Sequence, residues 1–221
     1  MLVNKIYFML AMALLVVSQW LIAAPNFILV LTDDHGWSSF SAPMDKTRPE
    51  AKSDYYQTPN MDALLGMGMR FSNGYAAAPV CSPTRYSIQF GKTPARLHRT
   101  RVQGKNRADH NQVAIPQVLK AIDSSYRAAH IGKWHIDADP DRYGYDLHDG
   151  VTKNKEGAFD NNDRQRQWGG YAEDDPKRVH SITSRAIEFM RESIDKDQPF
   201  FLQLSHYALH SNICLLYTSD A

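Results

Sequence analysis

A cysteine and an arginine lie four residues apart in the segment Cys81-Ser82-Pro83-Thr84-Arg85. Proline suits the first position of a helix, so we expect a helix to begin at Pro83, with Cys81 at its N-terminus. That end of a helix carries partial positive charge and free N–H groups, which favour a thiolate and an anionic ligand. Arg85 returns to the same face one turn later and adds a fixed cation. The segment therefore predicts chemistry on a sulfate or phosphate group.

Two adjacent carboxylates, Asp33 and Asp34, follow the continuously apolar segment 27–31. This segment predicts a strand that is buried on both faces, as in a parallel sheet. Open α/β sheets bind ligands beyond the carboxyl ends of their strands. Carboxylate oxygens there suit Ca²⁺ or Mg²⁺. The residues alone also permit a polar turn in which an aspartate caps a helix.

Basic side chains follow two further apolar segments. Lys133 and His135 come after an expected strand at 126–131, and in extended backbone they would share a face. An ordinary basic surface patch explains this pair equally well. Two histidines, His206 and His210, close the other apolar segment.

The elements that must position these groups follow an α/β pattern. Apolar strands are expected at 27–31, 126–131 and 200–207, and helices at 59–67, 83–90, 115–122 and 176–194. The last of these helices repeats apolar residues at helical spacing and should cover the sheet. Strand–helix–strand order predicts a mostly parallel sheet flanked by helices.

Composition excludes some classes of function. The chain has 221 residues and a net charge of +1, which gives no case for a nucleic-acid surface or a polybasic membrane patch. Its two cysteines, Cys81 and Cys214, cannot form a disulfide framework, although a single structural bond between them is the alternative to a reactive Cys81. The function must therefore lie in a localised site.

Residues 1–24 have the pattern of a secretory signal peptide, with Lys5 before an apolar run and small residues at Ala23 and Ala24. We expect cleavage and a secreted or periplasmic protein with no membrane association afterwards. An uncleaved membrane anchor is the alternative, because apolar residues continue to Ile22.

Taken together, the motifs resemble those of type I sulfatases, the formylglycine-dependent members of the alkaline-phosphatase-like superfamily. The resemblance rests on Cys-x-Pro-Thr-Arg at 81–85, on Gly-Lys-Trp-His at 132–135 and on the aspartate pair at 33–34. It implies that a maturation enzyme oxidises Cys81 to formylglycine, whose hydrate attacks the sulfur of a sulfate ester. It further implies that Arg85 stabilises this hydrate and that His135 assists proton movement.

The same resemblance implies roles for the remaining groups. Lys133 and His210 would contact the sulfate, although the proline that follows this histidine in the family is Asn212 here. His206 would then be structural. Asp33 and Asp34 would hold Ca²⁺, with Mg²⁺ the less favoured ion. The implied substrate is a sulfated small molecule or glycan.

The resemblance covers residues 25–212, the N-terminal part of a sulfatase catalytic domain, so the expected fold is incomplete at the C-terminus. The later calcium ligands and the later sulfate-binding lysine of the family have no equivalent in this chain. Residues 213–221 resemble translated sequencing-adapter sequence and are expected to be a non-native tail. We therefore expect the chain itself to be inactive.

Two other functions stay open at this stage. A phosphonate or phosphodiester hydrolase of the same superfamily can share the Cys-x-Pro-x-Arg site. A non-catalytic binding protein could keep the fold with an unmodified Cys81.

Overall fold

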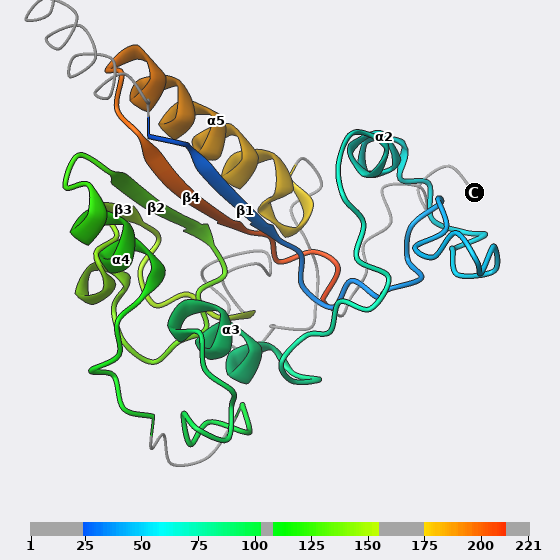
Figure 1. Ribbon diagram of the computed structural model, residues 1–221, viewed down its shortest axis with the longest axis horizontal. Helices are drawn as coiled ribbons and strands as arrows, with labels where there is room; N and C mark the ends of the chain where they lie inside the picture. The colour runs from blue at the N-terminus through cyan, green and yellow to red at the C-terminus, as the bar shows by residue number, and fades with distance from the viewer. Residues whose placement is uncertain (1–23, 103–107, 155–174, 211–221) are drawn as a thin grey trace, which may run out of the picture.

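The computed structural model describes residues 24–102, 108–154 and 175–210. Within them, parallel strands form one sheet in the order β1-β4-β2-β3 (Figure 1). The strands are β1 (Phe27–Leu31), β2 (Arg127–Gly132), β3 (Leu147–His148) and β4 (Phe200–Ser205). In the register, Leu202 of β4 lies between Ile28 of β1 and Ala129 of β2. The expected α/β fold with a mostly parallel sheet is confirmed.

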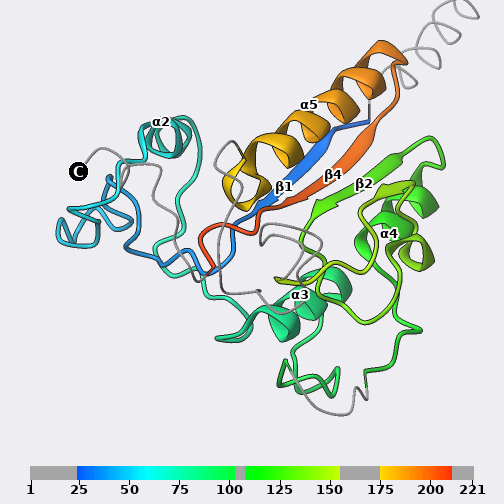
Figure 2. The same cartoon turned by 180° about the vertical axis from the view of Figure 1, so that it is seen from behind.

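Helices pack on both faces of this sheet. They are α3 (Cys81–Phe90), α4 (Ile115–Ile122) and α5 (Val179–Asp195), with short 3₁₀ helices at Pro140–Tyr143 and Pro176–Arg178. Helix α2 (Pro59–Met67) has no buried residue and lies away from the sheet (Figures 1 and 2). On one face, Phe189 of α5 packs in a cluster with Ala129 and Leu202. On the other, Tyr86 of α3 packs in a cluster with Ala128. Because neighbouring strand residues point to opposite faces, β2 contributes to both clusters.

Strand β1 differs from the expectation that it is buried on both faces. The exposed fractions of Phe27, Ile28 and Val30 are 42%, 53% and 53%. Within the described residues, β1 pairs only with β4 and forms one edge of the sheet, so its outer side has no neighbour (Figures 1 and 2). The strands buried on both faces are β2 and β4.

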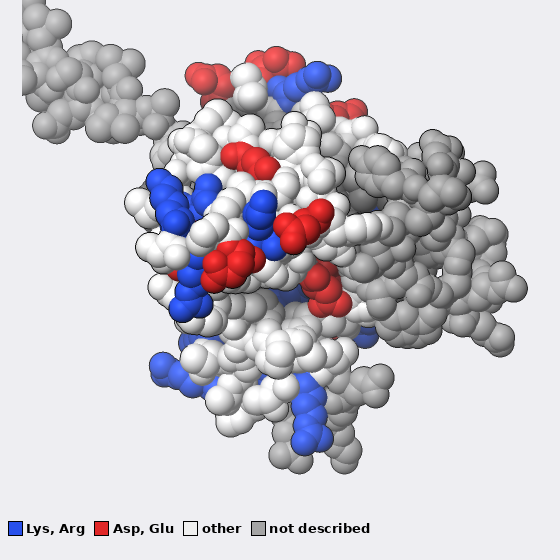
Figure 3. All heavy atoms as spheres, turned by 90° about the vertical axis from the view of Figure 1, so that its right-hand side faces the viewer, with Lys and Arg blue, Asp and Glu red and all other residues white. Residues whose placement is uncertain are grey.

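The surface beside α2 carries charges of both signs. Figure 3 shows basic and acidic side chains interspersed among uncharged ones on this face. Across the described ranges, no helix combines the length and apolarity needed to cross a bilayer. The expected signal peptide, apart from Ala24, lies outside the described residues, as do Cys214 and the whole of the 213–221 tail.

A histidine lies deep in the core of the sheet. His130 of β2 is completely buried, and the edges of Trp134 and Tyr145 lie against its ring, with centroids at 4.8 and 5.8 Å. Its ring nitrogens have no hydrogen-bond partner among the described residues. Burial, with a smaller effect of the positive charge on Arg85, lowers the pKa of His130 to about 3.

We expect the free energy of unfolding to fall as the pH drops from 6.5 toward 3. In that window the unfolded chain binds a proton at His130, whereas the folded chain does not. Above pH 6.5 His130 has no effect on the free energy of unfolding. Between pH 6.5 and 3 it lowers this free energy by about 1.4 kcal/mol per pH unit.

Urea unfolding at several pH values checks this, with His130→Phe compared to the wild type. His180→Phe, at an exposed position of α5, is the control. The His130 variant should lose part of the acid sensitivity, and the control should keep it. Equal pH slopes for all three proteins would contradict the prediction.

Candidate active site

The first turn of α3 presents Cys81. The helix begins at Cys81 itself, two residues before the expected start at Pro83, because Val80 already takes the extended cap position. The side chain of Thr84 donates a hydrogen bond to the carbonyl oxygen of Ala78 at 2.8 Å, which holds the preceding loop against the helix. Cys81 is partly exposed and forms no disulfide within the described residues. The expected placement of a thiol at a helix N-terminus is thus confirmed.

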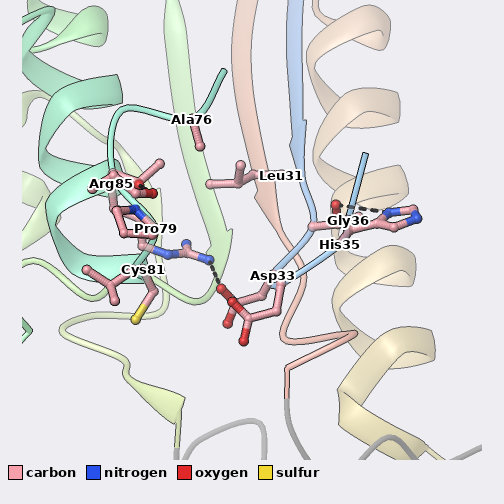
Figure 4. A pocket seen from close by; sticks show the side chains of 13 residues that line it. Leu31, Asp33, His35, Gly36, Ala76, Pro79, Cys81 and Arg85 are labelled. Carbon is pink, nitrogen blue, oxygen red and sulfur yellow. Dashed lines mark hydrogen bonds and ion pairs between the residues drawn. The ribbon is translucent and has the colours of Figure 1, made fainter. Parts of the chain in front are cut away.

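Cys81 and Arg85 line a cavity of about 560 Å³ together with Asp33 and Asp34 from the end of β1. Figure 4 shows Arg85 reaching from α3 toward Asp33, with the sulfur of Cys81 on the same side and His35 pointing away. One guanidinium nitrogen of Arg85 lies 3.5 Å from the Asp33 carboxylate. The helix start and the strand end therefore form two walls of one pocket.

Asp33 is the centre of a buried charge cluster. The Lys133 ammonium donates to its carboxylate, and the Arg85 guanidinium donates to the backbone oxygen of Lys133. The exposed fractions of Asp33, Arg85 and Lys133 are 4%, 3% and 0%. Burial lowers the pKa of both cations, and the charge of Asp33 opposes that shift. Two cations face one carboxylate, and the excess positive charge favours an anionic ligand.

The turn after β2 brings Lys133 into this cluster. Gly132 has φ +99°, and a Cβ there would lie 2.1 Å from the backbone oxygen of Ser205 on β4. That same oxygen accepts a hydrogen bond from the backbone N–H of Lys133 at 2.8 Å. Only glycine allows this close approach of the two strand ends, and the approach aims Lys133 at Asp33.

Thr152 holds the next part of the turn. Its hydroxyl accepts from the N–H of Trp134 at 2.9 Å and donates to the carbonyl of Gly132 at 2.6 Å. Its backbone oxygen accepts from the N–H of His135 at 2.8 Å. The backbone at His135 is left-handed, with φ +57°, so the extended geometry expected between Lys133 and His135 is wrong. Long-range hydrogen bonds impose the bend.

His135 is neutral at physiological pH. Its side chain is buried, and this burial, followed by the charges of Lys133 and Arg85, lowers its pKa to about 4. Its Nδ1 atom has no hydrogen-bond partner among the described residues. The alternative of a basic surface patch is excluded, because neither Lys133 nor His135 is exposed. A neutral imidazole near Lys133 and Arg85 can accept a proton.

His210 lies beyond the end of β4, near Asp34. Its Nε2 atom is 3.6 Å from the Asp34 carboxylate and 3.3 Å from the side-chain nitrogen of Asn154. Burial and then the charge of Lys133 lower its pKa. The backbone N–H of His206 donates to Leu31 at 2.8 Å, a bond between the strand ends that suits the structural role expected for His206. The structure therefore brings the sequence-predicted residues to one edge of the sheet.

A family model described as Sulfatase matches residues 25–220. The chain belongs to the sulfatase family. It is 26% identical over 219 residues to N-acetylgalactosamine-6-sulfatase from Homo sapiens, covering 86% of this chain and 40% of that protein. It is 30% identical over 194 residues to N-acetylglucosamine-6-O-sulfatase from Bacteroides thetaiotaomicron, covering 85% of this chain and 31% of that protein.

Solved structures agree with this assignment. One is described as a complex with its substrate D-glucosamine-2-N,6-O-disulfate. It superposes with a TM-score of 0.59 at 27% identity, covering 85% of this chain and 35% of that one. The sulfatase chain described here thus spans less than half the length of these relatives.

The described part of this sulfatase does not by itself fit a calcium ion. Ca²⁺ takes about 6–8 oxygen ligands, and among the described residues no group of three or more His, Cys, Asp or Glu side chains could hold a metal. The Asp33 carboxylate faces Lys133 and Arg85, and Asp34 faces His210. Calcium binding by the aspartate pair therefore stays a prediction, and it requires ligands from elsewhere.

Sequence reasoning missed two polar residues of this sulfatase site, Thr152 and Asn154. Both lie in a polar segment with no periodicity, and Asn154 is 56 residues from His210 along the chain. Only hydrogen bonds to residues far away in the chain show that these two residues belong to the site, and no local sequence pattern indicates such bonds.

Proposed function

We propose that this sulfatase hydrolyses sulfate esters, with a formylglycine derived from Cys81 as the reactive group. The observation that carries the proposal is the position of Cys81 at the N-terminus of α3, facing a cavity of about 560 Å³. Arg85 lines the same cavity, and its partners Asp33 and Lys133 form the buried charge cluster beneath it. The family match supports the reaction class.

The charge cluster would bind the sulfate group. Lys133 and His210 contact the sulfate oxygens in this proposal, and Arg85 keeps the cluster positive. Electrostatic stabilisation is strong at such a site because its donors are buried and held in place before the substrate arrives. The charge of Asp33 opposes the lowering of the Arg85 and Lys133 pKa values that burial causes.

The residue at position 81 has room for modification, because Cys81 is partly exposed to the cavity and free of a disulfide in the described chain. When formed, formylglycine would supply a hydrated aldehyde, one hydroxyl of which would be the nucleophile toward the sulfate sulfur, with the alcohol as the leaving group; loss of the proton from the second hydroxyl would then release sulfate and restore the aldehyde. Arg85, four residues along the same helix, orients the group at position 81. His135 is neutral because its pKa is about 4, and it assists proton movement at the group at position 81.

We propose a sulfated glycan as the substrate, and specifically an amino sugar with a 6-O-sulfate. Both curated relatives carry names that specify a 6-sulfate on an N-acetylated amino sugar. The solved relative was captured with a 6-O-sulfated glucosamine. A secreted or periplasmic location, with a formylglycine-generating enzyme as the maturation partner, completes the proposal.

The test is hydrolysis by the full-length gene product, co-expressed with a formylglycine-generating enzyme. Its substrates are 4-nitrophenyl sulfate, bis(4-nitrophenyl) phosphate and 6-sulfated N-acetylhexosamines. We expect sulfate esters to be preferred and the peptide containing Cys81 to show the mass of formylglycine. Preference for the phosphate diester would instead favour a phosphodiesterase, and an unmodified Cys81 without turnover would favour a binding protein. We expect the 221-residue chain alone to show no turnover.

A further inference from the structure

The guanidinium of Arg99 lies between the start of α3 and the turn after β2. Its Nε and Nη2 atoms lie 3.4 and 3.3 Å from the hydroxyl of Ser82, the residue next to Cys81. Its Nη2 atom also lies 3.0 Å from the carboxylate of Asp137, two residues after His135. Only 5% of Arg99 is exposed. One buried cation therefore bridges the start of α3 and the turn after β2.

Neighbouring groups hold this bridge in place. The guanidinium lies over the ring of Tyr86, 5.5 Å from its centroid. The hydroxyl of Tyr86 accepts a hydrogen bond from the backbone N–H of Asp137 at 3.0 Å. Lys153 lies 3.1 Å from the other Asp137 oxygen. Arg99 also donates to the carbonyl of Val102 at 2.8 Å, which anchors its own loop. The planar guanidinium thus has a fixed orientation toward Ser82 and Asp137.

We propose that Arg99 is a positioning residue that sets Cys81 against His135. The proposal rests on the proposed function, in which these two residues act on the same substrate. Arg99 itself contacts neither the cavity nor the sulfate in this scheme. Its effect is geometric, because Ser82 and Asp137 are each within two residues of a reactive group. A displacement of about 1 Å between reacting groups can slow catalysis roughly 100-fold.

The chain offers a matched control in Arg127. Its guanidinium pairs with Glu192 at 2.9 Å and lies 4.7 Å from the centroid of Phe189, so it also joins a carboxylate and a ring. It packs against α5 at the first residue of β2, the end of this strand opposite to the turn that carries Lys133 and His135. Arg127→Ala should therefore lower stability without moving the reactive groups.

The experiment compares Arg99→Ala, Arg99→Lys and Arg127→Ala in the full-length, matured enzyme, with 4-nitrophenyl sulfate as substrate. We expect Arg99→Ala to lower kcat roughly 30-fold with KM within about threefold, because Lys133 and Arg85 remain. Arg99→Lys should lose roughly 10-fold, since an ammonium cannot hold Ser82 and Asp137 together. Arg127→Ala should keep kcat within about twofold of the wild type. Equal kcat values for Arg99→Ala and Arg127→Ala would overturn the proposal.

A second readout separates this proposal from the proposed function. In protein made without the maturation enzyme, Cys81 remains a thiol, and its alkylation by iodoacetamide can be followed on its own peptide. Arg99→Ala should speed this alkylation several-fold by loosening the first turn of α3, and Arg127→Ala should not. If Arg99→Ala does not fold, Arg99→Lys and Asp137→Asn replace it in both measurements.

A changed alkylation rate would support the positioning role. If the matured, full-length protein also had no sulfatase activity, the proposed function would be refuted while the positioning role stood. An unchanged rate, together with unchanged kcat in an active enzyme, would refute the positioning role alone.

Discussion

Cys81→Ala is expected to abolish sulfate ester hydrolysis by the full-length, matured enzyme, lowering kcat/KM by roughly four orders of magnitude or more. The substitution removes the thiol that the proposed conversion to formylglycine requires. The Asp33–Arg85–Lys133 cluster stays in place, so binding of the sulfate should weaken far less than turnover. Initial rates with 4-nitrophenyl sulfate, together with inhibition by inorganic sulfate, measure the two effects separately.

The fold should tolerate this change. Cys81 is partly exposed at the first position of α3, where alanine is a good helix former. Ser87→Ala in the same helix is the matched control, because Ser87 lies outside the set of residues that line the cavity. The control should keep full activity, and both variants should keep the circular dichroism of the wild type. Hydrolysis by Cys81→Ala at more than a hundredth of the wild-type rate would rule out the proposed role of this residue.

Gly132→Ala is expected to lower the free energy of unfolding by about 3–5 kcal/mol. A Cβ at this position would meet the backbone oxygen of Ser205 at 2.1 Å, and the local φ of +99° is strained for alanine. The two strand ends would have to separate. That movement would break the hydrogen bond from Lys133 to Ser205 and shift the Lys133 ammonium away from Asp33.

Gly91→Ala isolates the backbone strain from the clash. Gly91 ends α3 with φ +60°, but nothing lies within 4 Å of the position that an alanine methyl would take, so a cost of about 1–2 kcal/mol is expected. Urea unfolding of the two variants and the wild type gives the comparison. A Gly132→Ala protein as stable as the Gly91→Ala protein would show that β2 and β4 can separate at little cost.

Local patterns predict most of the elements correctly. The apolar run at 27–31 matches β1 residue for residue, and the segment 115–122 matches α4. The last helix and strand agree with the expected ranges within a few residues. These elements are encoded by hydrophobic spacing and by proline and glycine at the helix ends, which act over a few residues.

Burial is harder to predict than the elements themselves. An apolar run such as β1 suggests two covered faces, but its place in the sheet depends on which strands pair with it. Helix α2 shows the same difference, because its apolar residue Leu64 is 58% exposed. Hydrophobicity indicates which residues can be buried, whereas long-range packing decides which ones are.

By itself, the sequence determined which groups can do chemistry in this sulfatase and that they follow strand ends or begin a helix. Parallel strands align their carboxyl ends, so Asp33, Lys133 and His210 had to converge near one edge. Only the tertiary structure decided that Asp33 faces two cations, that His135 is buried and neutral, and that Arg99 lies between Ser82 and Asp137. Those contacts join residues far apart in the chain, and their charge and burial arise only when the elements pack.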